Sequence, residues 1–203
     1  MTFAAGFVGG VLSSMPFGPI NLILVDLVSR RHFAKLFAFL AGVIVGDTLV
    51  AAACLWGLVR VDPDPHVALA LGAGCAAILL VYAVWSWRTT TPRTGVPSEP
   101  ASIARSAALG FSFCFFNPLF ALFWLSFIAG YRELFEVEAV PAPAFLSGLV
   151  VGDVVWFAAV GAVALAVVRN RGERFLVRLR KATSVGILGC ALVLIAAVVK
   201  RAL

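Results

Sequence analysis

Long runs of apolar residues alternate with short polar segments along the whole chain, and six of these runs contain at least 17 residues. Crossing about 30 Å of hydrocarbon takes about 20 helical residues. No run alternates apolar with polar residues as a half-buried strand does, and a backbone exposed to lipid must satisfy its own hydrogen bonds. The pattern therefore predicts an all-α membrane protein with six transmembrane helices, at residues 3–28, 37–58, 67–87, 107–129, 144–168 and 183–199.

The second and fifth predicted helices share a repeated segment. Residues 40–47 and 146–153 are identical at five of eight positions, and both segments end in Gly-Asp. Each segment belongs to a stripe of small residues four positions apart, and such stripes let two helix backbones approach closely in lipid. The stripes, which predict close helix contacts, are Ala38, Gly42 and Gly46 in the first copy and Ala144, Gly148 and Gly152 in the second.

Prolines interrupt the first and fourth predicted helices near their middles. Pro16 and Pro19 flank Gly18 in the first helix, and Pro118 follows Asn117 in the fourth. A proline removes a backbone donor and displaces the carbonyl four residues earlier, so each site should kink or unwind its helix. Such backbone is tolerated at membrane depth only where protein buries it or water reaches it.

The chain thus divides into two related halves, each with a broken helix, an acid-bearing helix and a third helix. Their predicted limits are residues 1–88 and 107–203, joined by a cytoplasmic linker at 89–106 that is rich in Pro, Thr and Ser. Because each half has an odd number of helices, the second half enters the membrane from the opposite side. The halves are therefore predicted to form an inverted repeat, a symmetry that in transporters places the substrate site at mid-membrane between the repeats.

Charge is scarce and unevenly distributed. Only 13% of the residues are charged and 62% are hydrophobic, against about 25% charged in soluble domains. Twelve of the sixteen Lys and Arg residues lie in three loops, which follow the first, third and fifth predicted helices. The positive-inside rule places those loops in the cytoplasm and both termini outside it. Membrane orientation thus accounts for the net charge of +6, and no nucleic-acid partner is predicted.

Two aspartates at mid-membrane are the candidate functional groups. Asp47 and Asp153 lie near the bilayer centre, where an acid costs roughly 2.5–3.5 kcal/mol. One interpretation is structural, with each acid protonated or capping backbone donors freed at the helix breaks. The other is that the acids bind a cation, either a substrate ammonium or a coupling proton. The amides of Asn21 and Asn117, with the backbone groups freed at the breaks, would then hold a substrate carboxylate. A molecule with an ammonium at one end and a carboxylate at the other is an amino acid.

The cysteines and the remaining membrane acid are assigned structural roles. The four cysteines have no Cys-x-x-Cys spacing, so neither a metal site nor a dithiol motif is predicted, and no cofactor is expected. They are expected to be small buried residues at Cys54, Cys75, Cys114 and Cys190. Asp26 lies four residues before Arg30, which favours an ion pair along one helix face over a part in transport.

Four short motifs connect this chain to a known family. They are Pro16-x-Gly18-Pro19-x-Asn21, then Arg30-Arg31, then Gly42-x-x-x-Gly46-Asp47, and finally Asn117-Pro118 with Phe-Trp-Leu-Ser-Phe at 123–127. With these motifs the chain resembles the LysE/RhtB family of amino-acid exporters over nearly its whole length. The resemblance implies a transporter rather than an enzyme, which exports amino acids or their analogues across the bacterial inner membrane, driven by the proton gradient. The residues it implicates are Pro16, Gly18, Pro19, Asn21, Gly46, Asp47, Asn117 and Pro118.

Two positions depart from the family's usual pattern. Phe17 replaces the first proline of the family's Pro-Gly-Pro, and Leu119 stands where a lysine usually follows Asn-Pro. The chain therefore resembles a divergent member, and its substrate class stays open. The expected partners are the lipid bilayer, a small-molecule cargo and, as an open alternative, a second copy of the chain.

Two rival functions also stay open. A divalent-cation exporter of the same broad superfamily would use Asp47, Asp153 and Asn117 as a site of hard oxygen ligands. A non-transporting membrane scaffold or a thiol electron carrier is the second rival. The carrier would need paired cysteines near the helix breaks, where Cys114 stands alone.

Overall fold

The computed structural model describes residues 1–15, 19–60, 102–135 and 140–168, with isolated helical positions within 73–88 and 181–196. Every element in these ranges is an α-helix, as the apolar runs predict. The predicted helices at 67–87 and 183–199 lie outside the described residues apart from the isolated positions, as do residues 89–101 of the linker. The helices are α1 (Thr2–Ser14), α2 (Pro19–Ser29), α3 (Phe33–Arg60), α5 (Ile103–Phe115), α6 (Pro118–Leu134) and α7 (Ala142–Val168).

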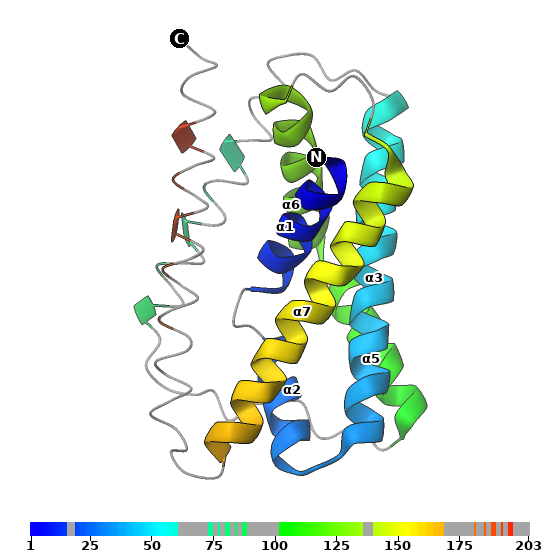
Figure 1. Ribbon diagram of the computed structural model, residues 1–203, viewed down its shortest axis with the longest axis vertical. Coiled ribbons are helices and arrows are strands. Elements are labelled where there is room, and N and C mark those ends of the chain that lie inside the picture. The colour runs from blue at the N-terminus through cyan, green and yellow to red at the C-terminus, as the bar shows by residue number, and fades with distance from the viewer. Residues whose placement is uncertain are drawn as a thin grey trace.

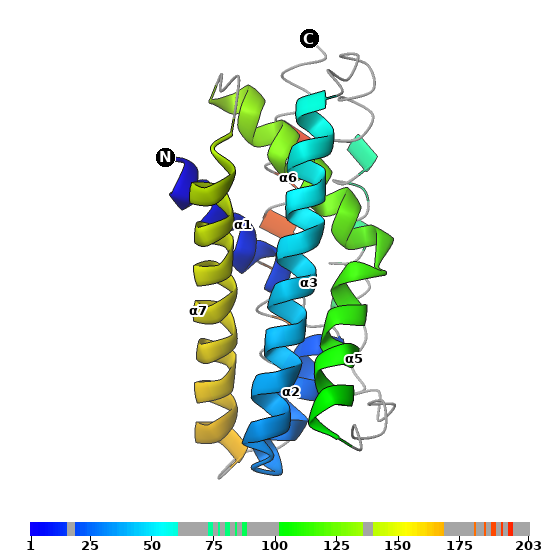
Figure 2. The ribbon, with the colours of Figure 1, turned by 90° about the vertical axis from the view of Figure 1, so that its right-hand side faces the viewer.

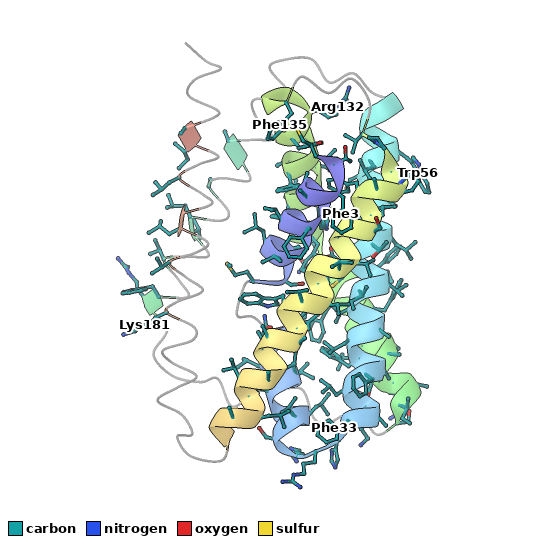
Figure 3. All side chains as sticks on the ribbon, in the orientation of Figure 1. Phe3, Phe33, Trp56, Arg132, Phe135 and Lys181 are labelled. Carbon is teal, nitrogen blue, oxygen red and sulfur yellow. The ribbon has the colours of Figure 1, made fainter. Side chains whose placement is uncertain are left out.

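Two long helices, α3 and α7, run the length of the described bundle (Figures 1 and 2). Their stretches Phe33–Gly57 and Ala142–Ala166 are each long and apolar enough to cross a membrane. Their outward faces carry exposed apolar side chains, such as Leu49 on α3 and Val154 on α7, as lipid contact requires. Figure 3 places Phe33 at one end of the bundle and Trp56 with Arg132 at the other, where aromatic and basic side chains suit the interfaces.

Both predicted helix breaks are present, and the helix after each break begins at a proline, Pro19 or Pro118. α1 ends at Ser14 and α2 starts at Pro19, while α5 ends at Phe115 and α6 starts at Pro118. Proline suits the first position of a helix because its missing N–H would have no intrahelical partner there. The α5–α6 pair bends by 54° and is a third candidate span. α5 begins earlier than the predicted position 107, because the Ser102 side chain caps it by accepting from the Arg105 N–H.

The small-residue stripes are helix contacts, as predicted, and they join the two halves of the chain. α1 packs along α7, and α5 packs along α3. A Cβ atom added at Gly148 or Gly152 would collide with backbone carbonyls of α1, and one added at Gly42 or Gly46 would collide with backbone carbonyls of α5. Each broken helix therefore lies against the acid-bearing helix of the other half. An inverted repeat would produce the same pairing of helices, and the inverted repeat itself stays a prediction.

Two apolar clusters occupy opposite ends of the bundle. One surrounds α2 and includes Val43 of α3 and Phe157 of α7. The other surrounds α6 and includes Val50 of α3 and Leu149 of α7. α3 and α7 each contribute residues to both clusters, and Asp47 and Asp153 lie on these helices between the two clusters. The fold places both carboxylates in a layer between two apolar cores.

Two local predictions are confirmed. Asp26 and Arg30 form the expected ion pair, with 3.1 Å between Asp26 Oδ1 and Arg30 Nε. Cys54 and Cys114 are buried free thiols, while Cys75 and Cys190 lie outside the described residues.

Candidate functional site

The last turn of α1 holds both membrane aspartates. Ser13 Oγ donates to Asp47 Oδ2 of α3 at 2.8 Å, and Ser14 Oγ donates to Asp153 Oδ1 of α7 at 2.8 Å. Both carboxylates are buried, and they interact electrostatically. Two consecutive serines at one helix end therefore bring together acids that are more than a hundred residues apart in sequence.

Asp47 has hydrogen-bond donors on both of its oxygens. The indole Nε1 of Trp124 in α6 donates to Asp47 Oδ1, opposite the bond from Ser13. Trp124 is itself fully buried and is held by ring contacts with Phe123 and Phe145. A buried indole N–H needs a partner, and this one joins α6 to α3. Asp47 thus connects three helices, α1, α3 and α6, through neutral donors.

Asp153 has a donor on only one of its oxygens. Ser14 satisfies Oδ1, whereas Oδ2 has no hydrogen-bond partner among the described residues although the side chain is 0% exposed. Buried polar atoms are rarely left without a partner in folded proteins, so such an atom needs an explanation. One turn further along α7, the indole Nε1 of Trp156 is a second buried polar atom without a partner in the described part of the chain.

Asn21 connects the two sides of the first helix break. Its amide Nδ2 donates to the backbone carbonyl of Ser14 at 3.0 Å, and its side chain is fully buried. The last carbonyls of a helix have no intrahelical donor, so a side-chain amide can complete the end of α1. Ser14 is thus held by two hydrogen bonds. Its hydroxyl donates to Asp153, and its backbone carbonyl accepts from Asn21 of α2. We name Ser13, Ser14, Asn21, Asp47, Trp124 and Asp153 the carboxylate cluster.

The sequence-predicted site residues fall into three groups. Asp47, Asp153 and Asn21 are in the carboxylate cluster, and Pro19 opens α2 two residues before Asn21. Pro16 and Gly18 lie outside the described residues. The remaining two residues are at the second break, where Asn117 is half-buried and Pro118 is exposed.

The second break lies near the cluster along α5. A Cβ atom added at Gly46 would lie 3.1 Å from the Cβ of Cys114, in the last turn of α5 before Asn117. Gly46 directly precedes Asp47, so the end of α5 contacts α3 at the depth of the carboxylates. The acids and both helix ends therefore occupy one level of the bundle.

Three cluster residues were not predicted from the sequence: Ser13, Ser14 and Trp124. The signal that could have identified the serines is a pair of adjacent hydroxyls in the last turn before a break, within an otherwise apolar helix. Trp124 belongs to the family-like segment at 123–127, but nothing local indicates that its N–H reaches an acid on another helix.

Replacing Trp124 with Phe is expected to lower the stability of the fold while keeping most of its packing. Asp47 Oδ1 would lose its donor inside the bundle, and an unsatisfied buried group costs about 1–3 kcal/mol, more when it is charged. The measurement is thermal unfolding in detergent. Trp156→Phe is the matched control, because the Trp156 Nε1 has no hydrogen bond to lose among the described residues. Equal melting temperatures for the two variants would contradict the structural role of the Trp124 bond.

Comparison with known proteins identifies the class of transporter. The model of the LysE type translocator family matches residues 11–201, which is nearly the whole chain and includes the complete carboxylate cluster. No match was found among curated proteins or among solved structures. The chain therefore belongs to the LysE-type translocator family, whose members are membrane transporters and not enzymes.

Proposed function

We propose that this protein exports amino acids or related small zwitterions from the bacterial cytoplasm, with protons moving in exchange. The observation that carries the proposal is the pair of buried carboxylates held at the end of a broken helix. Intramembrane acids are costly and usually mark a substrate or proton pathway. Family membership supports export, and the carboxylate cluster supplies groups for a cationic cargo group and for a proton.

The polar groups around the first break match the two ends of an amino acid. A cargo ammonium would bind at Asp153, whose Oδ2 is an acceptor without a partner among the described residues. A cargo carboxylate needs donors, and the N-terminal end of α2 carries the positive end of a helix dipole beside Asn21. The indole N–H of Trp156, one turn from Asp153, is a further donor on the same helix. In transporters with broken helices, such half-helix ends hold anionic cargo groups.

Alternating access is the mechanism that this architecture favours. The glycine contacts make α1 with α7, and α5 with α3, two closely packed pairs. We propose that movement of one pair against the other exposes the cluster to each side of the membrane in turn. The same proposal places the protein in the inner membrane, with both termini outside the cytoplasm as the loop charges predict. Assembly into a homodimer is a separate question that this proposal leaves open.

A divalent-cation exporter is the alternative to be tested beside it. That function would need Asp47 as a metal ligand, yet both Asp47 oxygens accept hydrogen bonds from Ser13 and Trp124. A metal would have to displace these donors. The bonding of Asp47 therefore favours the amino-acid cargo.

Efflux from proteoliposomes is the experiment that decides between the two. Vesicles preloaded with labelled basic, neutral and hydroxylated amino acids should release at least one of them when a pH gradient is imposed, and protein-free vesicles should not. Vesicles loaded with Mn²⁺ or Cd²⁺ are run in parallel. Metal release without amino-acid release would assign the protein to the cation exporters and contradict the proposal.

A further inference from the structure

The two aspartates related by the repeat have unequal surroundings. Asp47 accepts one hydrogen bond on each oxygen, from Ser13 and from Trp124. Asp153 accepts a bond from Ser14 on Oδ1, while its fully buried Oδ2 has no partner in the described part of the chain. Acids that are equivalent in sequence are therefore chemically different in the fold.

We propose that Asp153 is the acid that takes up and releases the transported proton, and that Asp47 is a permanent structural acceptor. The inference rests on the proposed proton-coupled export and assigns its chemistry to one residue. The proton binds at Asp153 Oδ2 and leaves from the same atom, so the proton and the cargo ammonium bind there in turn and not together. Ser14 keeps the carboxyl in place through Oδ1 in both protonation states.

The bonding of each acid supports this division. Removing an ionised carboxylate from water costs several kcal/mol unless donors compensate for the lost hydration. Asp47 has two such donors, one of them an indole fixed by aromatic packing, so its charge is stabilised by groups that stay in place. Asp153 has one donor, so its neutral, protonated form suits this conformation. A proton on Oδ2 removes the cost of a charge on the unsatisfied atom.

The neighbouring helices supply few other titratable groups. α7 packs against α1, α2 and α3. α1 has no titratable side chain, α2 has Asp26, which is paired with Arg30 away from the cluster, and α3 faces Asp153 with Asp47. The Cys114 thiol of α5 lies beside Gly46 and interacts with both acids. With Asp47 fixed by its donors, Asp153 is the carboxyl of this layer that is left to exchange a proton.

Infrared spectroscopy can detect that proton without any cargo. Purified protein in lipid nanodiscs is titrated while the C=O stretching band of protonated carboxyl groups is recorded. Exposed carboxyls titrate alike in wild type, Asp47→Asn and Asp153→Asn, and cancel in the difference spectra. The expected result is that Asp153→Asn loses the band of one buried carboxyl, whereas Asp47→Asn keeps it. Loss of the band in Asp47→Asn, or in neither variant, would overturn the assignment.

Serine variants keep the test decisive if Asp153→Asn does not fold. Ser14→Ala removes the donor to Asp153 Oδ1 and should shift the frequency of the buried band. Ser13→Ala removes a donor of Asp47 and none of Asp153, so it should leave the band in place. The reverse pattern would overturn the inference. Because the infrared titration uses no cargo, its result does not depend on the efflux assay. If efflux is observed but no Asp153 band titrates, the inference is refuted while the proposed function stands.

Discussion

Asp153→Asn is expected to lower proton-gradient-driven efflux by at least about tenfold, equivalent to ~1.4 kcal/mol of lost transition-state stabilisation. Asparagine keeps the size of the side chain and an amide oxygen for the Ser14 hydroxyl, but it cannot carry a proton. The fold should therefore survive while the coupling is lost. Efflux of labelled amino acids from proteoliposomes, measured over a series of imposed pH gradients, gives the result, and normal elution of the purified variant shows that it is folded.

Asp47→Asn is the matched comparison. Its amide oxygen can accept from Trp124 and its amide nitrogen can donate to Ser13, whose hydroxyl also lies 3.0 Å from the Gly10 carbonyl oxygen. This variant should fold and should retain pH-dependent efflux, at whatever rate the altered cluster allows. Efflux with unchanged rate and pH profile in both variants would mean that the carboxylates are purely structural.

Gly152→Leu should abolish most of the folded yield. The new side chain would meet the Phe7 carbonyl of α1, and α1 cannot move aside without drawing Ser14 away from Asp153. Overpacking typically costs about 1–3 kcal/mol, and a clash with backbone, which cannot change rotamer, belongs at the upper end or beyond. Gly46→Leu should do the same to the contact between α3 and α5. The measurement is the monodisperse fraction and its melting temperature in detergent.

Two other glycines on the same helices are the controls. A Cβ atom at Gly161 of α7 or at Gly57 of α3 would meet nothing within 4 Å, so leucine at either position should purify like wild type. If Gly152→Leu and Gly46→Leu are as stable as these controls, the small-residue stripes are not packing faces.

The features that sequence predicted correctly are local ones. Proline chemistry located both helix breaks, because a missing N–H has the same effect in any fold. The glycine spacing predicted close contacts at Gly42 and Gly148, because stripes of small residues can pack closely. It did not reveal which helix each stripe would meet, since that depends on how α1 and α5 cross between the halves.

The details of the carboxylate cluster could not be predicted for the same reason. Ser13 and Ser14 are adjacent in sequence, yet they donate to acids on different helices. The repeat places the two acids at matching positions of α3 and α7, but the helix ends beside them differ. α1 places Gly6, Gly10 and Ser14 on its packing face, whereas α5 places Ser106, Gly110 and Cys114 on the corresponding buried face. The second half therefore supplies a thiol where the first supplies a hydroxyl.

The two adjacent serines also give the end of α1 a mechanical role. Neighbouring residues on a helix point about 100° apart. When α1 rotates about its own axis, both hydroxyls therefore move by the same angle. A rotation that draws Ser14 away from Asp153 must change the approach of Ser13 to Asp47, and Trp124 resists that change through its own bond to Asp47. A group that binds one carboxylate and rotates α1 would therefore also act on the other carboxylate, and on α6 through Trp124.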